Sequence, residues 1–77
     1  MSDSADLLKR VTMNPQQCGG KPCIRGMRIR VSDILEMLAE NVSQTEILAD
    51  FPDLVAEDIQ ACLLFAARRT SFPSLAA

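Results

Sequence analysis

The sequence predicts an α+β fold that is mostly α, in which a short N-terminal pair of β-strands precedes three helices. Residues 27–31 alternate between apolar and cationic side chains, which is the period of a β-strand. From residue 32 onward, apolar residues recur at the three- and four-residue spacing of helices. The 77 residues suffice for one small domain. We expect this domain at 9–69, between a flexible N-terminus (1–8), frayed or in a short helical turn, and a flexible C-terminal tail (70–77).

The predicted strands lie on either side of a loop that contains two adjacent glycines. Lys9–Met13 favours the first strand because it carries β-branched residues, and Asn14-Pro15 then favours a turn. The alternating run Met27–Val31 favours the second strand, with one apolar face and one cationic face. An isolated hairpin is marginally stable in water, so we expect it to pack on the helices or to extend across a dimer. Pairing within one chain and pairing between two chains both stay open.

The first predicted helix begins at Asp33. Ser32 is a favourable N-cap residue, and the carboxylate of Asp33 suits the positive end of the helix dipole. Asn41 tolerates the left-handed backbone conformation that often follows the last helical turn. These signals predict a helix of about eight residues.

The second and third helices are separated by a turn that contains Pro52. Ser43 and Glu46 have the spacing of a capping box, which predicts a helix over Gln44–Asp50. The third helix is predicted over Ala56–Arg69. Its core-facing stripe is expected to hold residues at helical spacing, namely Val55, Ile59, Cys62, Leu63 and Ala66. Three helices in this order, with a short turn between the last two, are typical of a helix-turn-helix domain.

The cysteines do not have the spacing of a metal site. Cys18, Cys23 and Cys62 make an odd count, the chain has no histidine, and four residues between the first two cysteines are not the spacing of a zinc knuckle. The sequence shows neither a signal peptide nor an apolar run long enough to cross a membrane. We therefore expect a cytoplasmic protein with three reduced thiols, no metal, no cofactor and no membrane association, in which Cys62 packs in the core.

The charged residues are segregated along the chain. Residues 9–30 contain six basic residues and no acidic one, whereas residues 31–67 contain eight acidic residues and no basic one. Such segregation indicates two faces with different partners. The basic residues are the candidates for nucleic-acid binding: Arg25, Arg28, Arg30, Lys21, Lys9 and Arg10. They either contact DNA phosphates or pair with the acidic residues of the helices, and both alternatives stay open.

Protein binding is the second functional hypothesis. The acidic side of the helices suits a basic partner, because complementary potentials favour association. The partner-binding candidates are apolar residues outside the main stripe of the third helix or in the C-terminal tail: Leu64, Phe65, Phe72 and Leu75. The alternative is a solvated acidic surface and a tail without a partner. Because 48% of so short a chain is apolar, we expect a second copy to cover part of its surface in a homodimer.

Several short motifs follow one another along the chain. They are Gly20-Lys21-Pro22, Ile24-Arg25-Gly26, Arg28-Ile29, Ser43 with Glu46-Ile47-Leu48, Phe51-Pro52, and Asp58-Ile59 with Ala61 and Leu63. In this order they resemble the bacterial domain-of-unknown-function family 433, over about Val11–Arg69. The resemblance implies a homeodomain-like helix-turn-helix fold. It also implies the antitoxin of a toxin–antitoxin pair, with a PIN-like nuclease as the toxin and the promoter of the pair as operator DNA.

The sequence departs from the pattern of this family at three positions. Arg30 stands where members often have proline, and Asn41 stands where they often have glycine. Val55 stands where they often have a threonine or serine that caps the third helix, so the start of that helix should be weaker by about 1 kcal/mol. None of these changes opposes the predicted fold.

The sequence therefore predicts a binding protein. The chain has no histidine, no tyrosine and no recognisable pair of nucleophile and base, so we expect no enzymatic activity. The favoured function is that of an antitoxin that neutralises its toxin by protein–protein binding and regulates its own operon by binding DNA. The alternative is a small homodimeric adaptor or structural protein without a nucleic-acid role.

Overall fold

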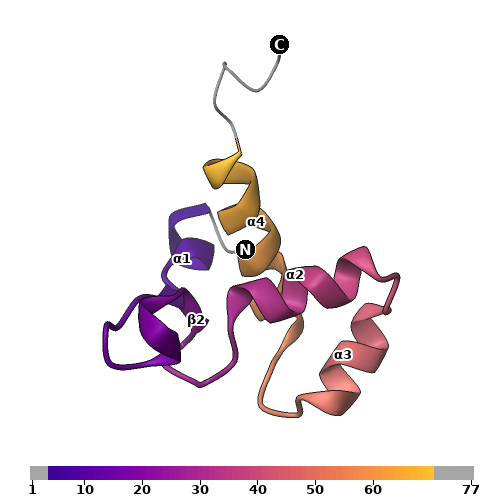
Figure 1. Ribbon diagram of the computed structural model, residues 1–77. Helices are drawn as coiled ribbons and strands as arrows, with labels where there is room; N and C mark the ends of the chain where they lie inside the picture. The colour runs from indigo at the N-terminus through magenta and orange to yellow at the C-terminus, as the bar shows by residue number, and fades with distance from the viewer. Residues whose placement is uncertain (1–3, 71–77) are drawn as a thin grey trace.

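The computed structural model describes residues 4–70 and confirms an α+β fold that is mostly α, with a strand pair followed by helices (Figure 1). Its elements in chain order are α1 (Ser4–Leu8), β1 (Val11–Thr12), the 3-10 turn η1 (Cys18–Gly20), β2 (Cys23–Ile24), α2 (Val31–Ala39), α3 (Gln44–Asp50) and α4 (Ala56–Arg69). Of the two alternatives for the N-terminal segment, residues 4–8 adopt the helical one.

Helix α4 is the element on which the others assemble. It contacts α1, α2, α3 and β1. Figure 1 shows α4 upright, with α1 and the loop-rich N-terminal part on one side, and α2 and α3 around its lower end. The basic N-terminal segment and the acidic helices therefore meet along this helix. No helix within residues 4–70 has the length and apolar character needed to cross a membrane.

The two strands pair with each other within the chain. β1 and β2 are antiparallel, with Val11 opposite Ile24 and Thr12 opposite Cys23. The Oγ1 of Thr12 also accepts a hydrogen bond of 2.9 Å from the backbone N–H of Gly26. Pairing within one chain is thus the arrangement that the structure shows.

The predicted position of the second strand, Met27–Val31, was wrong. β2 lies four residues earlier, and this run returns beside it. The backbone N–H of Ile24 donates to the carbonyl of Ile29 at 3.0 Å, and Cys23 and Arg30 form an isolated antiparallel bridge. The chain reverses at Arg25 and Gly26, whose φ angles are 47° and 73°. Two left-handed residues in succession match the twist of a tight hairpin turn, so the run becomes a return segment.

The alternation of the run nevertheless has the predicted consequence. Val31 is buried, and Met27 and Ile29 pack half-buried against the core. Arg28 and Arg30 are exposed on the opposite side. The run therefore has one apolar face toward the helices and one cationic face toward solvent.

Helix α2 begins two residues before its predicted start. Arg30 occupies the N-cap position, and Ser32, the predicted cap, lies exposed inside the first turn. The reason is tertiary: the backbone N–H of Val31 donates to the carbonyl of Pro22 at 3.0 Å, which satisfies one of the free donors of the first turn. The end of the helix is as predicted, because Asn41 has a φ of 71° in the left-handed region.

Helix α3 confirms its capping box. The Oγ of Ser43 accepts a hydrogen bond of 3.2 Å from the backbone N–H of Glu46, and the Oε1 of Glu46 accepts one of 3.4 Å from the backbone N–H of Ser43. The two residues thus satisfy each other's free backbone donors. The helix has the predicted bounds, as does α4.

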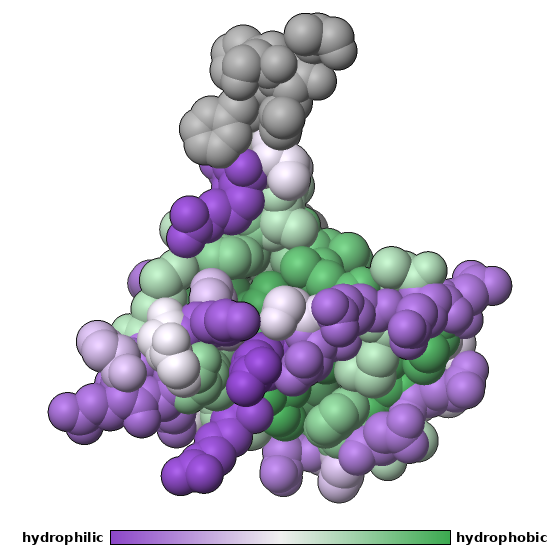
Figure 2. All heavy atoms as spheres, in the orientation of Figure 1, coloured by the Kyte–Doolittle hydropathy of each residue, from purple (hydrophilic) through white to green (hydrophobic). Residues whose placement is uncertain are grey.

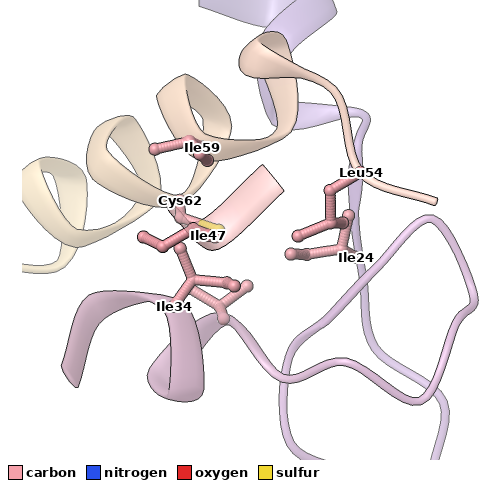
Figure 3. Packing of buried hydrophobic residues seen from close by; sticks show 7 residues of the cluster. Ile24, Ile34, Ile47, Leu54, Ile59 and Cys62 are labelled. Carbon is pink, nitrogen blue, oxygen red and sulfur yellow. The ribbon is translucent and has the colours of Figure 1, made fainter. Parts of the chain in front are cut away.

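The core lies where the return segment, α2, α3 and α4 meet. Figure 3 shows its side chains pointing toward a common centre. The buried residues of this cluster are Ile24, Val31, Ile34, Ile47, Leu54, Ile59 and Cys62. Full burial of an isoleucine stabilises by about 1.5–3 kcal/mol, so the four isoleucines provide much of the apolar contribution. Cys62 is in the core, as predicted.

Two members of the predicted stripe of α4 are on the surface. Val55 is 45% exposed and Leu63 is 46% exposed, whereas Ala61, which was not in the stripe, is buried. Successive helical residues are rotated by about 100°, and the buried arc of α4 runs through Asp58, Ile59 and Cys62. Leu63 falls beyond the edge of that arc, and Val55 is the extended residue before the helix, so the place of both in the core stripe was wrong.

Candidate functional site

Asp58 is the only buried charged residue in the part of the chain that the structure describes. It is 0% exposed and lies in the first turn of α4. Its Oδ1 accepts hydrogen bonds from the Nη1 of Arg10 at 3.1 Å and from the Nε of Arg25 at 3.0 Å. Its Oδ2 accepts hydrogen bonds from the Nη2 of Arg25 at 2.9 Å and from the backbone N–H of Val55 at 3.0 Å. Each of the two carboxylate oxygens thus accepts two hydrogen bonds.

The Asp58 cluster, made of Arg10, Arg25, Val55 and Asp58, joins three distant parts of the chain. Arg25 binds the carboxylate in a bidentate manner with two parallel N–H groups, which is a strong and geometrically specific arrangement. The Nη2 of Arg25 also donates to the carbonyl of Asp53 at 2.7 Å, and its backbone N–H donates to the carbonyl of Arg10 at 2.7 Å. The cluster therefore fixes the N-terminal segment on the start of α4.

The electrostatics of this cluster favour the ionised carboxylate. Burial raises the pKa of Asp58, but the hydrogen bonds from Arg25, Val55 and Arg10 outweigh it and hold the pKa below its usual value. The hydrogen bond to Asp58 is also the main cause of a raised pKa of Arg25. Two of the six predicted nucleic-acid-binding residues, Arg10 and Arg25, thus have their guanidinium groups engaged with an acidic residue of α4, which is the second of the two alternatives.

The importance of Asp58 was missed at the sequence level. One feature of the sequence indicates its burial: Asp58 lies four residues before Cys62 and three before Ala61, on the face of α4 that is buried. The carboxylate of Asp58 also compensates for the poor cap at Val55, because it accepts a hydrogen bond from the backbone N–H of Val55. The weakness predicted for this helix start is thereby countered from inside the helix.

Two more of the predicted basic residues share a pocket. The arginine pocket has a volume of about 340 Å³ and is lined by Gln16, Gln17, Cys18, Arg28 and Arg30. Two of its lining residues are arginines, and none of them carries a carboxylate. Its chemistry is that of an anion site.

The two predicted lysines lie outside the arginine pocket. Lys9 follows α1 and forms an exposed ion pair of 3.8 Å with Asp6. Lys21 is exposed in the loop before β2. The structure therefore divides the basic residues into a pair that holds the Asp58 cluster, a pair in the arginine pocket, and two surface lysines.

The expectation of three reduced thiols was wrong. Cys18 and Cys23 form a disulfide, and Cys62 is the free cysteine among the described residues. The turn from Cys18 to Gly20 has left-handed backbone angles at all three residues, which bends the chain back toward β2. Burial and the nearby charge of Asp58 raise the pKa of Cys62 to about 12, so this thiol is not a nucleophile at neutral pH.

A second cavity is apolar and lies between α1, β1 and the C-terminal half of α4. This apolar groove has a volume of about 290 Å³, and Figure 2 shows apolar surface between α1 and α4. The guanidinium of Arg69 lies 5.0 Å from the centre of the Phe65 ring, within the range of a cation–π contact. The groove is lined by Leu8, Val11, Met13, Phe65, Arg68 and Arg69.

The partner-binding candidates are only partly placed by the structure. Phe65 lines the apolar groove. Leu64 is half-buried and is not among the groove residues. Phe72 and Leu75 lie outside the described residues.

Comparison with known proteins places the chain in a family. The family described as "Protein of unknown function (DUF433)" matches residues 11–66. The uncharacterized protein y4eO of Sinorhizobium fredii (strain NBRC 101917 / NGR234) is 33% identical over 66 residues, which are 86% of this chain and 30% of that protein. The chain thus spans about a third of the length of this relative.

A solved structure agrees with the sequence match. The crystal structure of a DUF433 member from Anabaena variabilis ATCC 29413, determined at 2.00 Å resolution, superposes with a TM-score of 0.74 at 30% identity. The superposition covers 77% of this chain and 58% of the other. Fold and sequence agree: this chain belongs to the DUF433 family.

Proposed function

We propose that this protein is the cytoplasmic antitoxin of a type II toxin–antitoxin pair and that it neutralises a PIN-like nuclease toxin by binding it. The apolar groove is the observation that carries the proposal. It presents Met13, 53% exposed, and Phe65 in one concave surface with two arginines at its border. Concave apolar surfaces with a charged rim are typical of protein-binding sites.

The acidic surface of α2, α3 and the residues that directly follow them supports a second area of contact with the toxin. Its carboxylates are exposed, and no basic residue interrupts them between residues 31 and 67. They suit a basic patch on a nuclease, because complementary charge speeds association and sets orientation. These residues are Glu36, Glu40, Glu46, Asp50 and Asp53.

Binding, rather than catalysis, is the mode of action that we infer. The only buried carboxylate within residues 4–70 is occupied by two arginines, and the free thiol has a raised pKa of about 12. Neither group is poised as a base or a nucleophile.

Mutation of the groove tests the proposal. Met13→Glu places a charge in the groove, and we expect it to weaken binding of the purified PIN-like toxin at least tenfold. Gln60→Glu is the matched control, because Gln60 is exposed on α4 and lies outside both the groove and the Asp58 cluster. Isothermal titration calorimetry measures both affinities. Equal affinities of the two variants would overturn the assignment of the groove, and absence of binding by the wild type would overturn the antitoxin function.

DNA binding is the second candidate function. The exposed residues Lys21, Arg28 and Arg30 form no ion pair within residues 4–70. Arg28 and Arg30 stand on the side of the return segment that faces away from the core, and Lys21 lies in the loop before β2. Lysine and arginine contacts to phosphates provide most of the sequence-independent affinity for DNA. A homodimer would place two such segments on one operator, as palindromic sites require.

The proposed homodimer is tested by measuring the mass of the protein in solution. Leu63 and Val55 are both close to half exposed, and apolar side chains of this size are commonly covered at subunit interfaces. We expect multi-angle light scattering to give twice the chain mass of 8.4 kDa. A mass of one chain would favour a monomeric binding protein.

A further inference from the structure

The arginine pocket concentrates positive charge without a partner for it. Arg28 and Arg30 are two residues apart on one face of the return segment, and both line the pocket. Within residues 4–70 neither forms an ion pair, in contrast to Arg10 and Arg25. Two like charges that share one cavity repel each other, and an anion between them removes this repulsion.

The other wall residues of the arginine pocket, Gln16, Gln17 and Cys18, belong to an ordered turn. The backbone N–H of Gln17 donates to the carbonyl of Asn14 at 2.9 Å, and the backbone N–H of Gln16 donates to the Oδ1 of Asn14 at 2.9 Å. The Nε2 of Gln17 donates to the carbonyl of Gly26 at 2.6 Å, which ties the turn to the hairpin. The pocket is therefore formed by the folded chain before any ligand arrives.

A disulfide joins the two sides of the pocket. Cys18 belongs to the wall, and its bond leads to Cys23, which lies opposite Arg30 in an antiparallel bridge. The bond thus holds the Gln16–Cys18 turn beside the arginines. Disulfides in proteins of the cytoplasm are commonly reversible, and a bond beside a binding site can change its shape.

We propose that the arginine pocket binds a phosphate group and that the Cys18–Cys23 bond holds it in its binding shape. Guanidinium groups match the oxygens of phosphate with two parallel hydrogen bonds, and the amide of Gln16 is a further donor on the wall. A phosphodiester of duplex DNA and the phosphate monoester of a mononucleotide share this chemistry. The proposal deepens the DNA-binding part of the proposed function and is independent of toxin binding.

Reduction of the bond is a two-electron step. One thiolate of a dithiol reductant attacks a sulfur of the pair, the other protein sulfur leaves as a thiolate and takes up a proton, and the second thiol of the reductant resolves the mixed disulfide. The products are the two thiols of Cys18 and Cys23 and the cyclic disulfide of the reductant. After reduction, the turn that contains Cys18 is no longer covalently joined to Cys23, which pairs with Arg30.

A salt titration of binding to a short duplex DNA tests the phosphate site. For Arg28→Gln we expect an affinity about tenfold weaker and a salt dependence that is less steep by about 0.9 in the logarithmic slope, as expected for one lost phosphate contact. Lys9→Gln is the control, because it removes one positive charge outside the pocket. An equal change in both variants would overturn the assignment, since it would show that any surface charge serves equally.

Two small probes distinguish the sources of the phosphate. A mononucleotide and inorganic phosphate are titrated against the wild type and Arg28→Gln by nuclear magnetic resonance. Duplex binding that depends on Arg28, with weak binding of both small probes, identifies a phosphodiester. Mononucleotide binding that depends on Arg28, without duplex binding, identifies a monoester and overturns the DNA-binding function while it keeps the pocket. Failure of all three probes overturns the pocket.

Dithiothreitol tests the role of the disulfide. We expect reduced wild-type protein to bind the favoured probe several-fold more weakly than oxidised protein, and re-oxidation by oxidised glutathione to restore binding. Cys18→Ser/Cys23→Ser should bind like the reduced protein and should not respond to reductant. Unchanged affinity on reduction, with the loss of the bond verified by a mass increase of about 2 Da, would overturn this part of the proposal. Toxin binding by the same variants keeps the two functions separate.

Discussion

Asp58 shows how one side chain can decide the role of its neighbours. A buried carboxylate is costly unless donors surround it, and here two arginines and a backbone N–H do so. Arg25 also has a φ of 47°, a backbone conformation that is unfavourable for residues other than glycine. The same residue therefore forms both the left-handed turn and the bidentate contact with Asp58, and the contact helps to hold the turn in this unfavourable conformation.

Replacement of Asp58 tests this arrangement. Asp58→Asn keeps the size of the side chain but leaves Arg10 and Arg25 without a counter-charge. We expect the free energy of unfolding to fall by about 3 kcal/mol, toward the low end for a broken buried ion pair because both arginines are partly exposed. Glu57→Gln, at the neighbouring exposed position, should change it by less than about 0.5 kcal/mol. Urea denaturation measures both, and equal effects would contradict the cluster.

Because the pKa of Asp58 is lowered, we expect the stability of the folded protein to depend on pH in the acidic range. The folded protein holds this carboxyl ionised below its ordinary pKa of 3.8, so between the two pKa values the unfolded state binds more protons. The stabilisation is complete well above pH 3.8 and is lost as the pH falls through the folded pKa. We expect the unfolding free energy of the wild type to drop below about pH 4 and that of Asp58→Asn to drop less. Parallel curves for the two proteins would assign the acid sensitivity to other carboxyls.

At the scale of elements, residues close to a helix end were sufficient to predict where that helix begins or ends, in the cases where these residues alone determine the end. The bounds of α3 and α4 agree with the sequence prediction, because a capping box, a proline and a helical period define them. The start of α2 and the position of β2 depend on contacts between residues that are separated along the sequence. Pro22 supplies a carbonyl to α2, and the left-handed turn after β2 directs the return segment. Neither follows from local propensity.

Two serines test the difference between a local and a tertiary helix start. Ser43→Ala removes the side-chain acceptor of the capping box of α3, and we expect a loss of about 1 kcal/mol in unfolding free energy. Ser32→Ala removes a serine that lies inside the first turn of α2, so we expect a change close to zero, or slightly stabilising because alanine favours helix. Thermal unfolding compares them. A larger loss for Ser32→Ala would mean that this serine caps α2 after all.

At the scale of the whole molecule, the segregation of charge has two consequences. The sequence predicted two faces but left open whether the arginines pair with the acidic helices or face a ligand. The structure divides them: Arg10 and Arg25 meet Asp58, whereas Arg28 and Arg30 line a pocket without carboxylates. This division could not be predicted from composition, because it depends on the turn at 25–26, which directs neighbouring arginines to different places.

The disulfide and the apolar groove also depend on the assembled fold. Cys18 and Cys23 meet because a left-handed turn folds the chain back, and the groove forms because α1 packs on α4. Phe65 was identified as a partner-binding candidate from its place outside the stripe, and it lines the groove; Leu8, Val11 and Met13 come from the N-terminal segment, which no helical pattern links to α4. Sites that combine segments distant in the sequence therefore cannot be predicted from a single sequence.

The most direct test of the division is a comparison of two arginines three residues apart. Arg25→Gln and Arg28→Gln each remove one positive charge, and urea denaturation gives the unfolding free energy of each variant. We expect Arg25→Gln to lose about 2–3 kcal/mol, because Asp58 loses a bidentate partner. Arg28→Gln should stay within about 0.5 kcal/mol of the wild type. Equal losses, or a larger loss for Arg28→Gln, would contradict the claim that Arg10 and Arg25 form a structural pair with Asp58 to which Arg28 and Arg30 do not belong.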